Sequence, residues 1–350
     1  MSLRQTFDHK LNALNAIRLA MAIGVIVWHS YPLSGHDISF APLRQFVADV
    51  WVDGFFAISG FLITSSWVRR PDMRAFVAAR ALRILPAFYV CLIVTAFVVA
   101  PVGIAWQGGN AAALLKSFAP FEYVSSNMAV WVFQRDIGGT PANVPHEGTW
   151  NGSLWTLGWE ALCYVGVLVL GLAGLLRRRW VLPSTFGAVW IVLVASALLA
   201  LPGHLENGAR FGIMFLAGAV IFQYQDSIRC SWALVGAAVA ITAGSMFLTD
   251  YRLVGAIFWA YAVICAGALI KVERLRLRED LSYGAYIYAF PIQQLLVIAV
   301  GPLTPLLFAV VATAVTLPIA AMSWFAVEKP TLRLKNRLDR ESVRNRVPST

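Results

Sequence analysis

The chain has 350 residues, of which 59% are hydrophobic and only 13% are charged, and its net charge is +10. Soluble domains are nearer half apolar and a quarter charged, so the composition excludes an ordinary soluble protein and indicates an integral membrane protein. Cytoplasmic loops of membrane proteins collect Lys and Arg, which explains the positive charge without a nucleic-acid partner.

Apolar runs long enough to cross a bilayer recur along the chain, separated by Pro, Gly and charged residues. They predict an all-α fold, a polytopic membrane helical bundle of about ten transmembrane helices. One membrane domain is expected over 1–330, followed by a basic cytoplasmic tail over 331–350 that forms a fraying surface helix. The predicted spans are 13–31, 48–68, 82–101, 153–176, 181–201, 210–225, 232–248, 252–270, 281–301 and 304–326.

The distribution of Lys and Arg orients these spans. With the N-terminus inside, 22 of the 28 cationic residues lie in cytoplasmic segments and five lie in outside segments. This asymmetry predicts the orientation, and an even number of spans then leaves both termini in the cytoplasm. No cleavable signal peptide is expected, because Arg18 interrupts the first apolar run.

The first span carries Arg18 and His29, two residue types that are rare in lipid. They are eleven residues apart, so at 100° per residue they share one helix face, about 16 Å apart along the axis. Arg18 lies near the inner surface and His29 in the outer third. Either both serve one site, or Arg18 reaches the inner headgroups and His29 sits at the outer interface.

Asp53 enters the second span at a depth near that of His29. A carboxylate beside an imidazole fixes its tautomer and raises its basicity. Asp53 also fits the position of a helix N-cap, and the two roles are compatible.

Arg80 and Arg83 follow in the cytoplasmic loop before the third span. Their i, i+3 spacing places them on one face of a helix start, where the pair can bind a phosphate. If these two arginines stood alone, the usual excess of Lys and Arg in cytoplasmic loops would explain them.

The longest loop, 102–152, is expected outside and is rich in aromatic residues. We expect part of it, 111–134, to be helical and to lie on or dip into the membrane. Its aromatic side chains either stack on sugar rings or form an interfacial belt.

Glu160 lies about seven residues into the fourth span, which is too deep for an interface anchor. It is either a site residue or part of a buried structural ion pair. Cys163, one turn later, is a poor nucleophile because a thiol in lipid stays protonated. The cysteines show no metal-binding spacing, so we expect free thiols and no metal at Cys91, Cys163, Cys230 and Cys265.

The ninth span opens at Asp280 and continues through three tyrosines to Gln293 and Gln294, which are expected to face the bundle interior. The tenth span ends at Glu328-Lys329-Pro330.

Taken together, these segments resemble the acyltransferase-3 family of bacterial membrane O-acyltransferases, over about 12–330. Many relatives have His immediately before the proline of the ninth span, where this chain has Phe290, so no role is carried over from that position. The form of 280–294 looks like the branch that acts on exopolysaccharide or O-antigen. The resemblance rests on Arg18 with His29, 51–61 around Asp53, Arg80 with Arg83 and Pro86, 151–160, 280–294 and 328–330.

The resemblance implies transfer of an acyl group from a cytoplasmic acyl-CoA, usually acetyl-CoA, to a sugar hydroxyl. The acceptor would be a polysaccharide or lipid-linked oligosaccharide at the bacterial inner membrane, with polysaccharide-assembly proteins as further partners. Arg80 and Arg83 would hold the CoA phosphates, and Arg18 would hold the pyrophosphate or the entrance for the pantetheine arm.

In this hypothesis His29 is the general base on the acceptor hydroxyl, or a transient acyl carrier, and Asp53 or Glu160 orients it. Intramembrane charges also fit a proton-coupled transporter or a flippase of glycan precursors. The lack of an internal repeat and the cytoplasmic arginine pair disfavour that reading. A scaffold subunit of an export complex would leave the buried charges unexplained.

Overall fold

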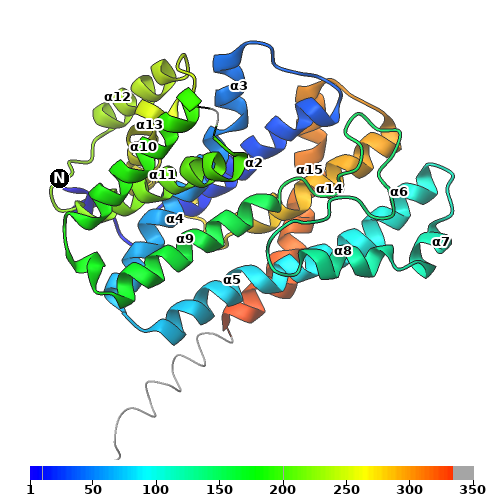
Figure 1. The fold of residues 1–350 in the computed structure, drawn as a ribbon, viewed down its shortest axis with the longest axis horizontal. Coiled ribbons are helices and arrows are strands. Elements are labelled where there is room, and N and C mark those ends of the chain that lie inside the picture. Colours follow the sequence, from blue (N-terminus) through cyan, green and yellow to red (C-terminus); the bar gives the residue numbers. More distant parts are fainter. Residues whose placement is uncertain (10, 200, 334–350) are drawn as a thin grey trace, which may run out of the picture. The chain divides into compact units, whose positions relative to one another are not determined.

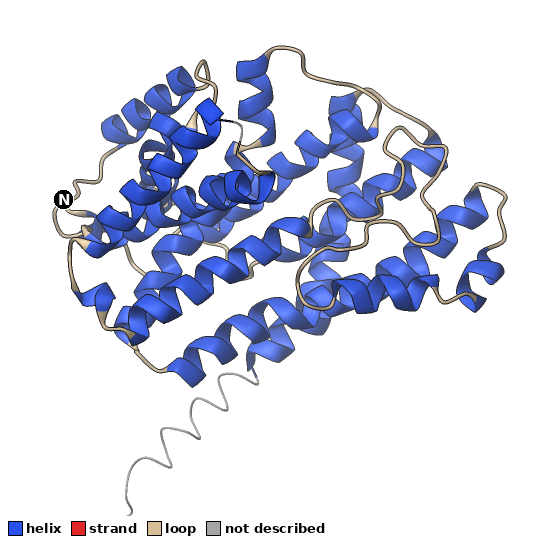
Figure 2. Cartoon of the chain, in the orientation of Figure 1, coloured by secondary structure: helices blue, strands red, loops and turns tan. Residues whose placement is uncertain are grey.

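The computed structural model describes residues 1–9, 11–199 and 201–333, so most of the predicted tail lies outside the described residues. The described residues form helices and loops without strands (Figure 2). Nine of their helices are long and apolar enough to cross a membrane, which confirms the predicted all-α membrane fold. These are Leu14–Leu33, Val50–Arg69, Met73–Trp106, Trp155–Leu172, Val181–Leu199, Gly203–Gln223, Arg252–Leu269, Ser282–Val300 and Pro305–Arg333.

Several predicted spans have different bounds in the structure. The run 210–225 belongs to the helix Gly203–Gln223, which begins earlier than predicted. The run 232–248 forms only the 14-residue helix α12 (Trp232–Ser245), about 21 Å long at 1.5 Å per residue, which is shorter than a hydrocarbon core of about 30 Å. The third span begins earlier than predicted, at Met73, because the Asp72 side chain caps the helix by accepting from the Ala75 N–H. Arg80 and Arg83 therefore lie inside helix α5 (Met73–Val94), where the sequence indicated a loop and a helix start.

The chain divides into two compact units. Unit 1 comprises Met1–Trp28, Asp37–Pro71 and Trp159–Ser282, and unit 2 comprises His29–His36, Asp72–Gly158 and Tyr283–Thr350. The boundary falls three times within a helix: in α2 (Leu14–Leu33), in α9 (Trp155–Leu172) and after the first residue of α14 (Ser282–Val300).

Unit 1 is built around the pairing of α4 (Val50–Arg69) with α11 (Gly203–Gln223), shown in Figure 1. Glycines let these two backbones approach closely, as is common between membrane helices. A Cβ atom at Gly60 would lie 1.8 Å from the carbonyl oxygen of Phe215, and one at Gly218 would lie 1.9 Å from that of Ala57. Helix α11 also packs on α10 (Val181–Leu199) and α13 (Arg252–Leu269), and α12 packs on α13.

Unit 2 contains α5, which continues through the π-helical turn Thr95–Val99 into α6 (Ala100–Trp106). The remaining long helices of this unit are α14 (Ser282–Val300) and α15 (Pro305–Ser323), which continues into the π-helical turn Trp324–Glu328. Its apolar core joins the end of α2 to both of them through Leu33, Val144, Phe290, Val297 and Phe308.

The segment 111–134 contains two short helices, α7 (Ala111–Lys116) and α8 (Ala119–Asn127), followed by an irregular loop. The α6, α7 and α8 ribbons lie beside one another in Figure 1. Asn127 is fully buried and its side chain accepts from the backbone N–H groups of Phe133 and Gln134. Trp150 is also fully buried and donates to Thr140. These contacts hold the long loop in one backbone conformation.

Candidate active site

Helix α2 runs unbroken from Leu14 to Leu33, so Arg18 and His29 lie on a single helix as predicted. His29 is half-buried, yet its Nδ1 atom is fully covered and has no hydrogen-bond partner among the described residues. The imidazole packs edge-on against the ring of Phe290, with 5.0 Å between centroids. A covered ring nitrogen without a partner is costly in a purely structural role, and it marks His29 as a functional candidate.

A second histidine, His146, contacts the same phenyl ring from the long loop, with 5.8 Å between the centroids of His146 and Phe290. We call His29, His146 and Phe290 the histidine cluster. Burial lowers the pKa of the His146 imidazole, and Arg135 lowers it further, so the ring is neutral at physiological pH. His146 was not predicted as a site residue, because the loop around it has no helical or strand period.

Helix α14 holds the histidine cluster together. The buried Gln294 side chain donates to the backbone oxygens of His146 and Thr149, at 2.7 and 2.8 Å. Gln293, the preceding residue, donates to Ser30 Oγ at 2.9 Å. These contacts confirm that both glutamines face the interior, and they tie α14 to the loop and to the residue after His29.

Gly152, just before α9, leaves room for the Phe290 ring. A Cβ atom at this position would lie 2.5 Å from Phe290 Cε2. The next residue, Ser153, has a buried hydroxyl without a hydrogen-bond partner among the described residues. The conformation of Phe290, against which both imidazoles pack, therefore depends on a glycine.

Arg18 forms an ion pair with Asp280, with 2.6 Å between Nη1 and Oδ2. The two side chains are 20% and 10% exposed. The Arg18 guanidinium also stands 5.8 Å from the ring centroid of Phe55. Asp280 in turn accepts from Ser282, which begins α14. The charge of Arg18 is thus already offset by the Asp280 carboxylate, a pairing that the sequence did not predict.

Arg80 and Arg83 lie three residues apart on α5, in unit 2. Arg83 pairs with the buried carboxylate of Glu328 at 3.3 Å. Its guanidinium also stands 5.6 Å from the ring centroids of Tyr283 and Trp324. Arg80 stacks on Phe76, one turn earlier on the same helix, at 5.6 Å. Such aromatic contacts hold a guanidinium plane while leaving its N–H edge able to bond.

Asp53 is fully buried in unit 1 and is paired there with Arg252, with 2.7 Å between Oδ2 and Nε. The Tyr251 hydroxyl also donates to Asp53. Arg252 further contacts Asp49 at 3.3 Å and Asp250 at 3.1 Å, and Arg210 contacts Asp49 at 2.9 Å. Asp53 therefore belongs to a buried charge network, and its predicted action on His29 stays a prediction.

Glu160 accepts hydrogen bonds from Ser59 at 2.7 Å and from Tyr164 at 2.5 Å. Ser59 comes from α4 and Tyr164 lies one turn further along α9, so these contacts also belong to unit 1. Its predicted action on His29 is likewise untested. All four cysteines are free, and the described residues contain no group of three or more His, Cys, Asp or Glu that could hold a metal ion.

A family profile described as an acyltransferase domain matches residues 11–325. An O-acetyl transferase of Shigella phage Sf6 is 28% identical over 346 residues, covering 92% of this chain and 96% of the relative. Nodulation protein 10 of Rhizobium leguminosarum bv. viciae is 26% identical over 315 residues, covering 81% and 82%. No solved structure is significantly similar. The chain therefore belongs to the acyltransferase-3 family and is a multi-pass membrane O-acyltransferase.

Proposed function

We propose that this enzyme transfers an acetyl group from cytoplasmic acetyl-CoA to a sugar hydroxyl of a polysaccharide or lipid-linked oligosaccharide in the bacterial inner membrane. The proposal is carried by His29, a half-buried imidazole whose covered Nδ1 atom has no partner among the described residues. It is supported by the similarity to a protein named an O-acetyl transferase. Membership in an acyltransferase family favours this reading over a transporter or flippase.

His29 supplies the base. A neutral imidazole has one nitrogen that can accept a proton, and in direct transfer the exposed side of His29 takes it from the acceptor hydroxyl. The hydroxyl oxygen then attacks the thioester carbonyl, and the bond between the carbonyl carbon and sulfur breaks. The leaving thiolate recovers the proton from the imidazolium, which gives an O-acetyl ester and CoA.

A two-step route is also compatible with the cluster. Here His29 attacks the thioester first and releases CoA, and the acyl-imidazole then passes the acetyl group to the sugar oxygen. In either route His146 is a positioning residue, because it packs on Phe290, against which the His29 ring rests. Labelled protein trapped by acid quench in the absence of acceptor would distinguish the acyl-enzyme route from direct transfer.

Arg80 and Arg83 are proposed to bind the CoA phosphates from the cytoplasmic side. The rings beside them hold each guanidinium in place, and Glu328 keeps Arg83 from carrying an uncompensated buried charge. Arg18 is proposed to bind the pyrophosphate or the start of the pantetheine arm, with Asp280 fixing its orientation. Asp53 and Glu160 are kept as candidates for orienting His29.

The test uses the purified full chain in detergent with radiolabelled acetyl-CoA and polysaccharide from a strain that lacks the enzyme. His29→Ala should lower the transfer rate by at least about 100-fold, the lower range for loss of a general base. His36→Ala changes an exposed histidine seven residues away and should leave the rate unchanged. Equal rates for wild type and His29→Ala would refute the assignment.

The donor site is tested separately. Arg80→Ala should raise the KM for acetyl-CoA about tenfold, as expected for loss of a charge-assisted hydrogen bond. Arg74→Ala, on the same helix and exposed, should not change it. A KM unaffected by Arg80→Ala would indicate that this arginine only contributes to topology.

A further inference from the structure

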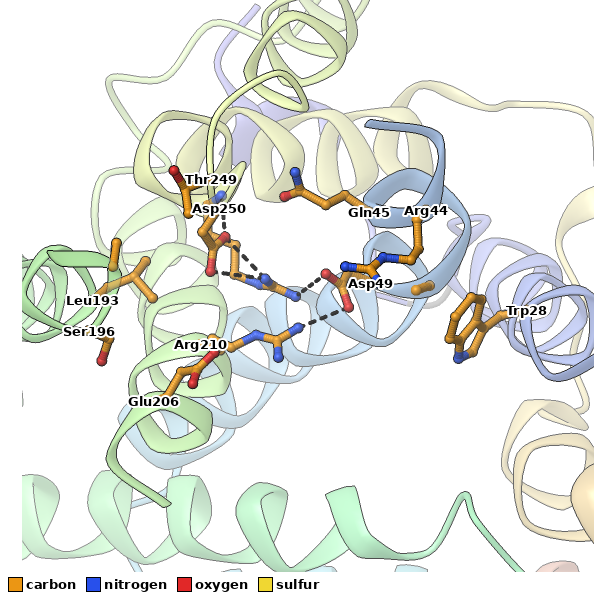
Figure 3. Close-up of a pocket in the computed structure, with 13 residues that line it drawn as sticks. Trp28, Arg44, Gln45, Asp49, Leu193, Ser196, Glu206, Arg210, Thr249 and Asp250 are labelled. Carbon is orange, nitrogen blue, oxygen red and sulfur yellow. Dashed lines mark hydrogen bonds and ion pairs between the residues drawn. The ribbon is translucent and has the colours of Figure 1, made fainter. Parts of the chain in front are cut away.

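Unit 1 contains a cavity of about 560 Å³ that the proposed chemistry does not use (Figure 3). It is bordered by the end of α3 (Ala41–Ala48), by α10 and α11, and by the turn that leads into α13. Small-molecule sites usually occupy about 300–1,000 Å³, so the cavity has room for a ligand. The Lys and Arg distribution places this end of the unit on the extracytoplasmic side, where a glycan acceptor would arrive.

One wall of the cavity is a fixed ion-pair network. Arg252 is 2% exposed and contacts Asp49, Asp53 and Asp250 within 3.3 Å. Arg210 contacts Asp49 at 2.9 Å, an ion pair that Figure 3 marks with a dashed line. Because each arginine has a carboxylate partner, this wall is polar but offers no uncompensated charge.

Other polar groups of the lining have no hydrogen-bond or ion-pair partner among the described residues. Arg44 and Glu206 are exposed side chains on α3 and α11 without an ion pair there. The Ser196 hydroxyl and the Nε atom of Arg210 are buried and lack hydrogen-bond partners in the described chain. The two covered atoms do not face the open cavity, whereas the exposed side chains of Arg44 and Glu206 offer a donor and an acceptor to a ligand.

The composition of the lining selects the class of ligand. Three arginines are balanced by three carboxylates, which disfavours CoA and other strongly anionic molecules. A neutral polyol can donate to carboxylates and accept from guanidinium groups at once. Trp28 lines the opposite side (Figure 3), and its indole offers a flat apolar face of the kind that packs against a sugar ring. Trp28 also directly precedes His29 in the chain.

We propose that this cavity binds a neutral sugar residue of the acceptor glycan. The inference rests on the proposed function, since the bound sugar would be part of the proposed acceptor glycan. Trp28 stacks on the ring, while Glu206 and Arg44 bond its hydroxyls. The network around Arg252 positions the helices that carry these groups.

Direct binding tests the cavity without requiring turnover. Saturation-transfer NMR on the purified full chain uses methyl α-glycosides of glucose, galactose, mannose and rhamnose, with methyl glucuronide and CoA as charged competitors. At least one neutral glycoside should give a saturable signal that Glu206→Ala and Trp28→Ala weaken about tenfold, as expected for loss of a good contact. His204→Ala, an exposed residue of α11 outside the cavity lining, should leave the signal unchanged.

The outcome separates this inference from the proposed function. Sugar binding that depends on Glu206 and Trp28 supports the cavity even if the purified protein transfers no acetyl group. The inference is overturned if no neutral glycoside binds, or if both variants bind as well as wild type. It is also overturned if the glucuronide or CoA displaces the neutral glycosides through these residues.

Discussion

The close approach of α4 and α11 gives a direct test of the unit 1 packing. In Gly60→Ala, the new methyl carbon would lie 1.8 Å from the Phe215 carbonyl oxygen, whereas carbon–oxygen contacts between packed helices are about 3.3 Å or longer. The helices must therefore separate locally by about 1.5 Å. The obstructing atoms, the carbonyl oxygen and carbon of Phe215, belong to the backbone, so no side chain can rotate away.

Overpacking of this kind costs about 1–3 kcal/mol, from which at most about 1 kcal/mol of improved helix propensity is recovered. We expect Gly60→Ala to lower the melting temperature of the detergent-purified chain by several degrees, measured by intrinsic tryptophan fluorescence. Gly187→Ala on α10 is the matched control, because no atom lies within 4 Å of its added Cβ. Equal melting temperatures for the two variants would refute the packing argument.

Three further predictions concern unit 2. Gly152→Ala should push on Phe290 and reduce kcat at least tenfold while the KM for acetyl-CoA stays unchanged, because only the histidine cluster is displaced. Glu328→Gln should lower the melting temperature more than the double variant Glu328→Gln with Arg83→Gln, because only the single variant leaves the Arg83 cation unpaired. A larger loss in the double variant would contradict this. Because the pKa of His146 is lowered by folding, protonation favours the unfolded chain, and stability should fall as pH drops below about 6.5. His146→Gln should weaken that dependence in melting curves between pH 8 and 5.5.

Much of the fold could be predicted because a membrane-spanning helix is recognisable in a sequence from the length and apolarity of its residues. One disagreement on length, α12, arose where hydropathy continues past the point at which the helix ends at Ser245. The start of the third helix was placed too late because Arg80 and Arg83 were interpreted as loop charges. Asp72 carried the correct signal, as an N-cap residue preceding the helix.

The candidate site was predictable only one residue at a time. The cost of charge in lipid singled out Arg18, but it could not identify its partner Asp280, which lies 262 residues away in sequence. The i, i+3 spacing singled out Arg83, but it could not identify its partner Glu328, 245 residues away. His146 was not predicted because its position depends on side-chain bonds from Gln294, 148 residues later. Such pairings follow from tertiary packing, which has no local sequence period.

The central claim, that His29 acts on the acceptor hydroxyl, is tested most directly in cells. Mass spectrometry of the surface glycan should show acetyl groups lost on deletion of the gene. They should be restored by the wild-type chain and by His36→Ala, but not by His29→Ala expressed at the same level. Full acetylation with His29→Ala would contradict the account.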